Sequence, residues 1–190
     1  MGFDFQGELA PDAKGRMRRR SSSALSGRSA DFRWFLAEVF ARFWEQKPAL
    51  EADDCMGLLA TDGSVPDPII VSIDKDMRTV PCKLLVNEQI EEVTSLDADR
   101  AWMAQTLTGD STDGYKGVKG VGPVTANKIL KDKTTVQEMW PAVVGAYMKA
   151  GLLAADAIRT ARLARILRAG DYCEQSKQVK LWVPPAAVPA

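Results

Sequence analysis

The sequence predicts an α/β fold in which a small parallel sheet is followed by a run of helices. A short β-branched run at 69–73 is bounded by charged residues, which is typical of a buried parallel strand. From about residue 98 onward, helical patterns predominate. The length of 190 residues fits one domain, with or without a small subdomain.

The expected elements can be placed in order along the chain. Apolar residues at 32, 35, 36, 39, 40 and 43 have the spacing of an amphipathic helix over 31–46. Further helices are expected over 52–61, 98–107, 124–130, 135–149 and 154–169, with strands over 69–73 and 83–86, a glycine-rich loop over 109–123 and an apolar run over 179–183. These two or three strands are fewer than a parallel sheet needs to bury its faces.

The absence of histidine narrows the possible chemistry. With no histidine, Ser-His-Asp triads, Cys-His triads and histidine-ligated zinc are excluded. Three scattered cysteines, Cys55, Cys82 and Cys173, fit neither a disulfide framework nor a CxxC zinc site. They indicate a reducing compartment, and no apolar run is long enough to cross a membrane, so we expect a cytoplasmic protein without a membrane partner.

The net charge of zero conceals a partition along the chain. Residues 1–50 have a balance of +3, residues 51–113 have 14 acidic and four basic side chains, and residues 114–190 have 12 basic and five acidic ones. An acidic middle suggests bound cations, and basic flanks favour a polyanion such as nucleic acid. Uneven surface charge without function is the alternative, and charge alone does not separate the two.

Acidic residues gather where the expected elements change. Glu51, Asp53 and Asp54 open a helix, Asp74 and Asp76 follow the buried strand, Asp110 and Asp113 lie in the glycine-rich loop, and Asp4 stands alone. The carboxyl edge of a parallel sheet is where ligands bind in open α/β folds. Any one cluster could instead be a solvated turn or a helix cap.

Seven carboxylates in three clusters cannot share a pocket without cations, because like charges would destabilise the fold. Hard oxygen ligands favour Mg²⁺ or Mn²⁺ over zinc. Two such ions about 4 Å apart are a known means of activating water and stabilising the leaving oxygen in phosphodiester hydrolysis. The three clusters together therefore predict a two-metal site.

The segment 117–126 has the pattern of a DNA-binding hairpin. Its glycines allow close approach to a phosphate, and the following helix presents its N-terminal N–H groups to the anion. Such a hairpin reads backbone rather than base sequence. The expected DNA-binding residues are Lys116, Gly117, Lys119, Gly120, Gly122, Thr125 and Lys128, with Lys131 and Lys133 nearby. A plain glycine-rich loop between helices is the alternative.

Two other residue groups have open interpretations. Trp34, Trp44, Trp102, Trp140 and Trp182 could stack on bases, but core packing is the favoured interpretation. Arg159, Arg162, Arg165 and Arg168 recur every three residues. They could form a DNA-facing stripe or a solvated helix face.

Taken together, these motifs resemble the 5′–3′ exonuclease and flap endonuclease family. The matching pieces are E-A-D-D at 51–54, V-S-I-D-K-D at 71–76, T-G-D-S-T-D-G-Y at 108–115 and G-V-K-G-V-G-P-V-T-A-N-K-I-L at 117–130. The G-D-S-T-D-G-Y form and the stretches at 161–172 and 180–184 are similar to the short exonucleases of podovirus-type bacteriophages. The resemblance covers roughly residues 31–184.

The resemblance implies a PIN-like nuclease core, truncated at its N-terminus, over 1–107, with a basic arch segment at 14–33. It implies a helix–three-turn–helix and helical region over 108–184, followed by a disordered tail over 185–190. The activity implied is a Mg²⁺- or Mn²⁺-dependent 5′–3′ exonuclease or 5′-flap nuclease acting on DNA. The family also binds K⁺ through the carbonyls of the hairpin.

The resemblance also assigns roles to individual residues. Glu51, Asp53 and Asp54 would serve the first metal, and Asp74, Asp76, Asp110 and Asp113 would complete the site and serve the second. Asp4 matches a family aspartate before the arch and would be a further metal ligand. Lys14 and Arg16 match the catalytic Lys and Arg of the family's Y-K-x-N-R signature, although Ala13 replaces the tyrosine.

The family opens with a further strand carrying an aspartate, and no residue here supplies it. We therefore expect a fragment, a gene with a misassigned start, or one half of a split enzyme that needs an upstream peptide. The alternative function is a catalytically inactive or incomplete DNA-binding fragment that keeps the hairpin.

Overall fold

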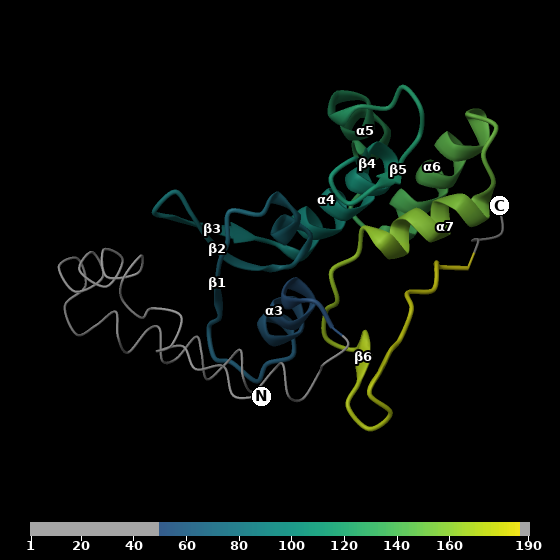
Figure 1. Ribbon diagram of the computed structural model, residues 1–190. Coiled ribbons are helices and arrows are strands. Elements are labelled where there is room, and N and C mark those ends of the chain that lie inside the picture. Colours follow the sequence, from purple (N-terminus) through teal and green to yellow (C-terminus); the bar gives the residue numbers. More distant parts are fainter. Residues whose placement is uncertain (1–49, 187–190) are drawn as a thin grey trace, which may run out of the picture. The chain divides into compact units, whose positions relative to one another are not determined.

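The computed structural model describes residues 50–186 (Figure 1). The chain divides into two units at Ala49/Leu50, and the described residues all belong to the second. Several predictions made from the sequence lie outside the described residues: the helix over 31–46, the basic segment 14–33, Asp4, Lys14, Arg16, Trp34 and Trp44.

The elements of the described part follow one another in α/β and then helical order. They are α3 (Ala52–Thr61), β1 (Ile69–Val71), η2 (Lys75–Thr79), β2 (Cys82–Val86), β3 (Gln89–Val93), α4 (Ser95–Thr108), β4 (Gly109–Asp110), β5 (Tyr115–Lys116), α5 (Pro123–Leu130), α6 (Val136–Lys149), α7 (Ala154–Leu163), β6 (Tyr172–Cys173) and β7 (Gln178–Val179). In Figure 1, the three-stranded sheet and α3 lie to one side, and α5, α6 and α7 lie to the other, with α4 between them.

The sheet is mixed rather than parallel. β1 pairs with β2 in parallel, with Ile70 opposite Leu84, as predicted. β2 then pairs with β3 in antiparallel fashion, and β3 was not predicted. The chain turns between them at Asn87 and Glu88, which both have positive φ, as a two-residue type I′ hairpin requires. β3 is charged and mostly exposed, so it carries no buried apolar run to reveal it.

Most of the helix boundaries that were predicted from the sequence are confirmed to within a few residues. α3 has the predicted bounds, and α5 and α6 differ from the prediction by a single residue at their starts. α4 begins at Ser95, three residues earlier than predicted, because the Thr94 hydroxyl accepts a hydrogen bond from the Asp97 N–H and caps the helix. The helix predicted over 154–169 is too long, since α7 ends at Leu163 and residues 164–171 leave the helix.

Two hydrophobic clusters hold the described part together. The sheet cluster contains Ile70, Met77, Val80, Leu84 and Ile166. The helical cluster is built from α4, α5, α6 and α7. Trp102 and Trp140 are buried in it, and Trp182 packs edge-on against both rings at 4.9 Å. Core packing is thereby confirmed for Trp102 and Trp140.

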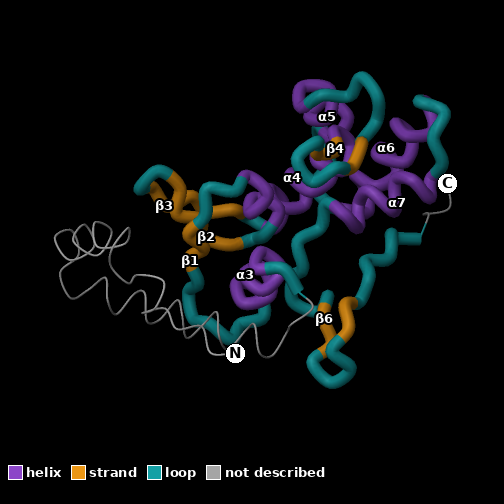
Figure 2. Tube along the Cα trace, in the orientation of Figure 1, coloured by secondary structure: helices purple, strands orange, loops and turns teal. Residues whose placement is uncertain are grey.

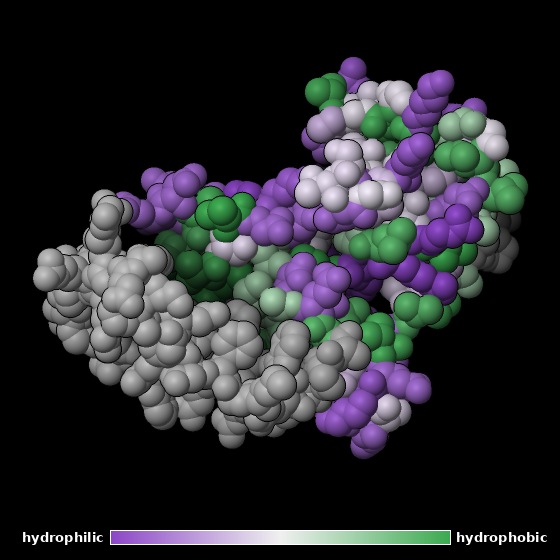
Figure 3. All heavy atoms as spheres, viewed as in Figure 1, coloured by the Kyte–Doolittle hydropathy of each residue, from purple (hydrophilic) through white to green (hydrophobic). Residues whose placement is uncertain are grey.

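The segment after α7 leaves the helices, forms the β6–β7 hairpin and returns to place Trp182 against them (Figure 2). The turn of this hairpin carries exposed hydrophilic side chains (Figure 3). None of the helices in 50–186 combines the length and apolar character needed to cross a bilayer.

Two glycines, Gly109 at the end of α4 and Gly117 after β5, bring two backbones into contact. Gly109 has φ +71°, and a Cβ there would lie 2.2 Å from the Gly117 nitrogen. A Cβ on Gly117 would lie 2.3 Å from the Leu107 oxygen. The Val118 N–H donates to the same Leu107 carbonyl at 2.8 Å. This approach joins the acidic turn to the 117–126 hairpin.

Substituting alanine at Gly109 is expected to destabilise the protein more than the same change at Gly114. Both positions have positive φ, so each substitution is strained by at least about 1–2 kcal/mol, and Gly109, with ψ 177°, is in a region that is essentially restricted to glycine. Gly114 faces open space, whereas Gly109 meets backbone atoms, so Gly109→Ala adds about 1–3 kcal/mol for the clash. Denaturant unfolding of both variants measures the difference, and equal losses would contradict the close approach.

Candidate active site

Three carboxylates from separate segments converge at one place. The ligand oxygens of Asp76, Asp110 and Asp113 all lie within 4.8 Å of one another. Asp76 belongs to η2. Asp110 is the last residue of β4, which directly follows α4, and Asp113 lies in the turn between β4 and β5. In the described part of the chain these are the residues grouped closely enough to hold a metal ion.

Local hydrogen bonds set the direction of the acidic segment after β1. The Ser72 hydroxyl accepts from the Asp74 N–H at 3.0 Å, and the Asp74 carboxylate accepts from the Asp76 N–H at 2.9 Å. Asp74 therefore caps η2, and the chain turns sharply after the strand. Asp74 itself stays exposed, beside the three converging carboxylates and outside their group.

Lys75 compensates the charge of the cluster. Its ammonium lies 2.5 Å from Asp110 Oδ2, and the Thr112 N–H donates to the other oxygen, Oδ1, at 2.7 Å. The Asp110 side chain is only 4% exposed. The hydrogen bond from Lys75 is the main reason that the pKa of Asp110 is lowered to about 2. Asp110 is therefore a buried, ionised carboxylate at neutral pH.

The pKa of Asp76 shifts in the opposite direction, because burial outweighs its favourable contacts. Desolvation raises the pKa of Asp76 above its ordinary value, and a hydrogen bond from Gln105 opposes that rise. The negative charges of Asp74 and Asp110 add to the rise. A cation at this position would relieve both the desolvation and the repulsion.

Tyr115 completes the surroundings of the cluster. Its hydroxyl is buried and makes no hydrogen bond of ordinary geometry, although Gln105 lies close enough to lower its pKa. Burial, followed by the charges of Asp76, Asp110 and Asp113, raises the pKa of this phenol. Sequence reasoning gave no role to Lys75, Gln105 or Tyr115. The signal for Lys75 was its place between Asp74 and Asp76, where a lysine is the obvious counter-ion.

The acidic residues that open α3 form a separate group. Glu51 is exposed, Asp53 and Asp54 are half-buried, and none belongs to the group within 4.8 Å. Asp54 Oδ1 accepts a hydrogen bond from the Leu167 N–H at 3.0 Å. Desolvation raises the pKa of Asp54, and Asp53 and Glu51 add to that effect. The prediction that these residues serve the same metal site stays a prediction.

The predicted DNA-binding residues surround the start of α5. Lys116, Lys119 and Lys128 are exposed, as are Gly120, Gly122 and Thr125, while Gly117 is half-buried against α4. Gly122 is the N-cap of α5 and supplies no side-chain hydrogen bond, so the first N–H groups of the helix have no capping side chain. The potassium site at the hairpin carbonyls stays a prediction.

Neither interpretation of the arginine row, a DNA-facing stripe or a solvated helix face, holds for all four residues. Arg159 pairs with Asp156, and the Arg162 Nε donates to the Trp182 carbonyl. Arg165 and Arg168 lie beyond the end of α7, and their side chains are only 13% exposed. They face inward, toward carboxylates and an aromatic ring, rather than toward solvent.

The known proteins that are similar to this chain include exonucleases. No family model matches the chain, and no solved structure matches it. It is 32% identical to the Exonuclease of Escherichia phage T7 and 30% identical to the Exodeoxyribonuclease of Enterobacteria phage T3. Each match covers 79% of this chain and 62% of the relative. It is also 30% identical to a 5'-3' exonuclease of Bacillus subtilis, over 47% of this chain and 36% of that protein.

The resemblance to the 5′–3′ exonuclease family, in its phage form, is confirmed by these relatives. The mixed α/β architecture of the described residues is compatible with such a protein. The chain spans 62% of the length of the two phage relatives.

Lys75→Met is expected to raise the pKa of Asp110. Because the folded-state pKa lies below the ordinary 3.8, Asp110 contributes stability above pH 4 that is lost as the pH falls toward 2. Removing Lys75 removes the main cause of the low pKa, so this acid-sensitive contribution should shrink. A carboxyl-carbon NMR titration in the presence of chelator measures the pKa directly. Lys83→Met, which breaks the exposed pair with Asp67, is the matched control and should leave Asp110 unchanged.

Proposed function

We propose that this chain is a divalent-metal-dependent 5′–3′ nuclease that hydrolyses phosphodiester bonds of DNA. The observation that carries the proposal is the convergence of Asp76, Asp110 and Asp113 within 4.8 Å. The phage relatives, named as an exonuclease and an exodeoxyribonuclease, support the reaction class. The substrate form proposed is a duplex with a recessed 5′ end or a 5′ flap.

The chemistry of the donors fits Mg²⁺ or Mn²⁺. Carboxylate oxygens are the ligands that these ions prefer. Asp76 is half-buried and Asp110 is buried, so little solvent is available to stabilise the negative charge of either side chain. Asp76, Asp110 and Asp113 would hold a metal, and Glu51, Asp53, Asp54 and Asp74 are the proposed ligands that complete a two-ion site. Such ions supply Lewis-acid activation of water and stabilisation of the leaving oxygen.

The residues around the carboxylates have their own parts in this proposal. Lys75 holds the charge of Asp110 in the absence of a cation, and its side chain is 67% exposed, so it can withdraw when a cation binds. The Tyr115 hydroxyl is buried beside the cluster and makes no hydrogen bond of ordinary geometry, so it could turn toward a ligand there. Both would orient groups around the reacting phosphate.

The hairpin would hold the DNA close to this site. β5 connects Asp113 directly to the hairpin, so the carboxylate cluster and the exposed lysines are adjacent in the chain. The uncapped N–H groups of α5 and the ammonium groups of Lys116, Lys119 and Lys128 would contact backbone phosphates. Binding of this kind is insensitive to base sequence.

Asp76→Asn is expected to abolish metal-dependent cleavage. The loss should exceed the roughly 10–100-fold that is typical when a residue that only orients a ligand is removed. The assay uses 5′-recessed and 5′-flap duplexes with Mg²⁺, with Mn²⁺ and with chelator. Asp132→Asn is the matched control, because Asp132 is exposed and outside the cluster, and its positive φ suits asparagine.

Binding of DNA without cleavage by the unaltered chain would contradict the proposed activity. That result would support the alternative of an incomplete DNA-binding fragment. Cleavage that survives Asp76→Asn would show instead that the reaction takes place elsewhere.

The double variant Lys119→Ala, Lys128→Ala is expected to weaken DNA binding equally for all sequences. Each phosphate contact that is lost should reduce the slope of log affinity against log salt by about 1. Fluorescence anisotropy at several salt concentrations, with chelator present, measures both quantities. Lys149→Ala, at an exposed lysine near the end of α6, is the control. An unchanged salt slope in the double variant would contradict the hairpin as the binding surface.

A further inference from the structure

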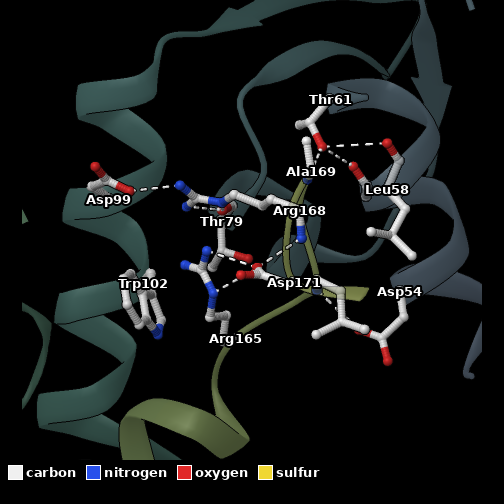
Figure 4. Close-up of polar contacts among 12 residues, drawn as sticks. Asp54, Leu58, Thr61, Thr79, Asp99, Trp102, Arg165, Arg168, Ala169 and Asp171 are labelled. Atoms are coloured by element: carbon white, nitrogen blue, oxygen red, sulfur yellow. Dashed lines mark hydrogen bonds and ion pairs between the residues drawn. The ribbon is translucent and has the colours of Figure 1, made fainter. Parts of the chain in front are cut away.

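Residues 164–171, which follow α7, connect all three elements that carry the acidic clusters. α3 carries Asp53 and Asp54, η2 carries Asp76, and α4 leads directly into Asp110. The contacts between this segment and the three elements are hydrogen bonds and ion pairs across long sequence distances (Figure 4).

The first set of contacts is with one face of α3. The Leu167 N–H donates to Asp54 Oδ1 at 3.0 Å, and the Ala169 N–H donates to the Thr61 hydroxyl at 2.7 Å. Between them, a Cβ on Gly57 would lie 2.3 Å from the Leu167 oxygen. Positions 54, 57 and 61 share one face of the helix. The segment therefore lies directly on the α3 backbone and binds one oxygen of a predicted metal ligand.

The second set comes from the Arg168 side chain. Its guanidinium donates through Nε and Nη2 to the carbonyl of Thr79, the last residue of η2. Its Nη1 donates to Asp99 Oδ1, on α4, at 2.6 Å. One planar guanidinium thus joins η2 to α4, while its own backbone neighbours bind α3.

The segment is also held in shape from within. Asp171 Oδ2 accepts from the Arg168 N–H and from Arg165 Nε, both at 2.9 Å. The Arg165 guanidinium lies over the Trp102 ring at 4.5 Å. Ile166 enters the sheet cluster, and Ala164 enters the helical cluster. The turn is a fixed structure rather than a loose connection.

We infer that Arg168 is a positioning residue for the metal site. Through the 164–171 segment it keeps the Asp54 carboxylate in a constant position relative to Asp76 and Asp110. Affinity for the divalent cation therefore depends on Arg168, although Arg168 is not a ligand. The inference rests on the proposed function, because it requires that these carboxylates bind a cation.

The test compares Mn²⁺ binding by the full chain, measured from the free-ion EPR signal, with the free energy of unfolding. Arg168→Lys keeps the charge, but one ammonium cannot reproduce the forked contacts to Thr79 and Asp99. Losing an orienting partner typically costs 10–100-fold in metal affinity, so a loss of at least about tenfold is expected. Gly57→Ala, which pushes the segment off α3, should reduce affinity in the same direction.

Val143→Ala is the matched control, because Val143 is buried in the helical cluster, on α6. Affinities are compared under conditions in which all variants are folded. If Arg168→Lys binds Mn²⁺ as tightly as Val143→Ala does, Arg168 is merely structural and the inference is wrong. If the unaltered chain binds no Mn²⁺, the proposed metal site itself fails. DNA binding in chelator, which depends on the hairpin, should remain unchanged in Arg168→Lys.

Discussion

The mutual repulsion of Asp76, Asp110 and Asp113 is the constraint around which the described part of the molecule is organised. Three carboxylates within 4.8 Å, two of them shielded from water, would destabilise the fold without compensation. Lys75 and the Thr112 N–H supply part of that compensation on Asp110. The repulsion that is left uncompensated is what a bound cation would relieve, in agreement with the metal site proposed above.

The fold meets this constraint with α4. This helix is part of the helical cluster, and it also packs against η2, which carries Asp76. At its end, Gly109 and Gly117 allow two backbones to touch, so Asp110 lies immediately beside the root of the hairpin. A single rigid helix thereby fixes the acidic cluster and the predicted DNA-binding surface to the same support.

Local patterns in the sequence predicted the structural features that are determined by residues close together in the chain. The bounds of α3, the short strand at β1 and the amphipathic α6 follow from spacing and turn residues alone. The acidic clusters were found because carboxylates stand at the ends of elements. β3 was missed, because its charged, exposed residues carry no hydrophobic signal and only its turn marks it. The separate position of Glu51, Asp53 and Asp54 could not be predicted, because it depends on how α3 packs.

Arg165 and Arg168, which follow α7, show why the residues that position the carboxylates could not be predicted from the sequence. Their spacing of three residues is a helical pattern, yet Arg165 and Arg168 bind partners that are distant in the chain. The Arg168 side chain donates hydrogen bonds to the backbone carbonyl of Thr79. Leu167 and Ala169 contact α3 through hydrogen bonds from their backbone N–H groups. Backbone contacts of this kind leave almost no trace in the amino-acid sequence. A carboxylate can therefore be recognised as a ligand from its motif, whereas the residues that orient it become visible only when the chain is folded.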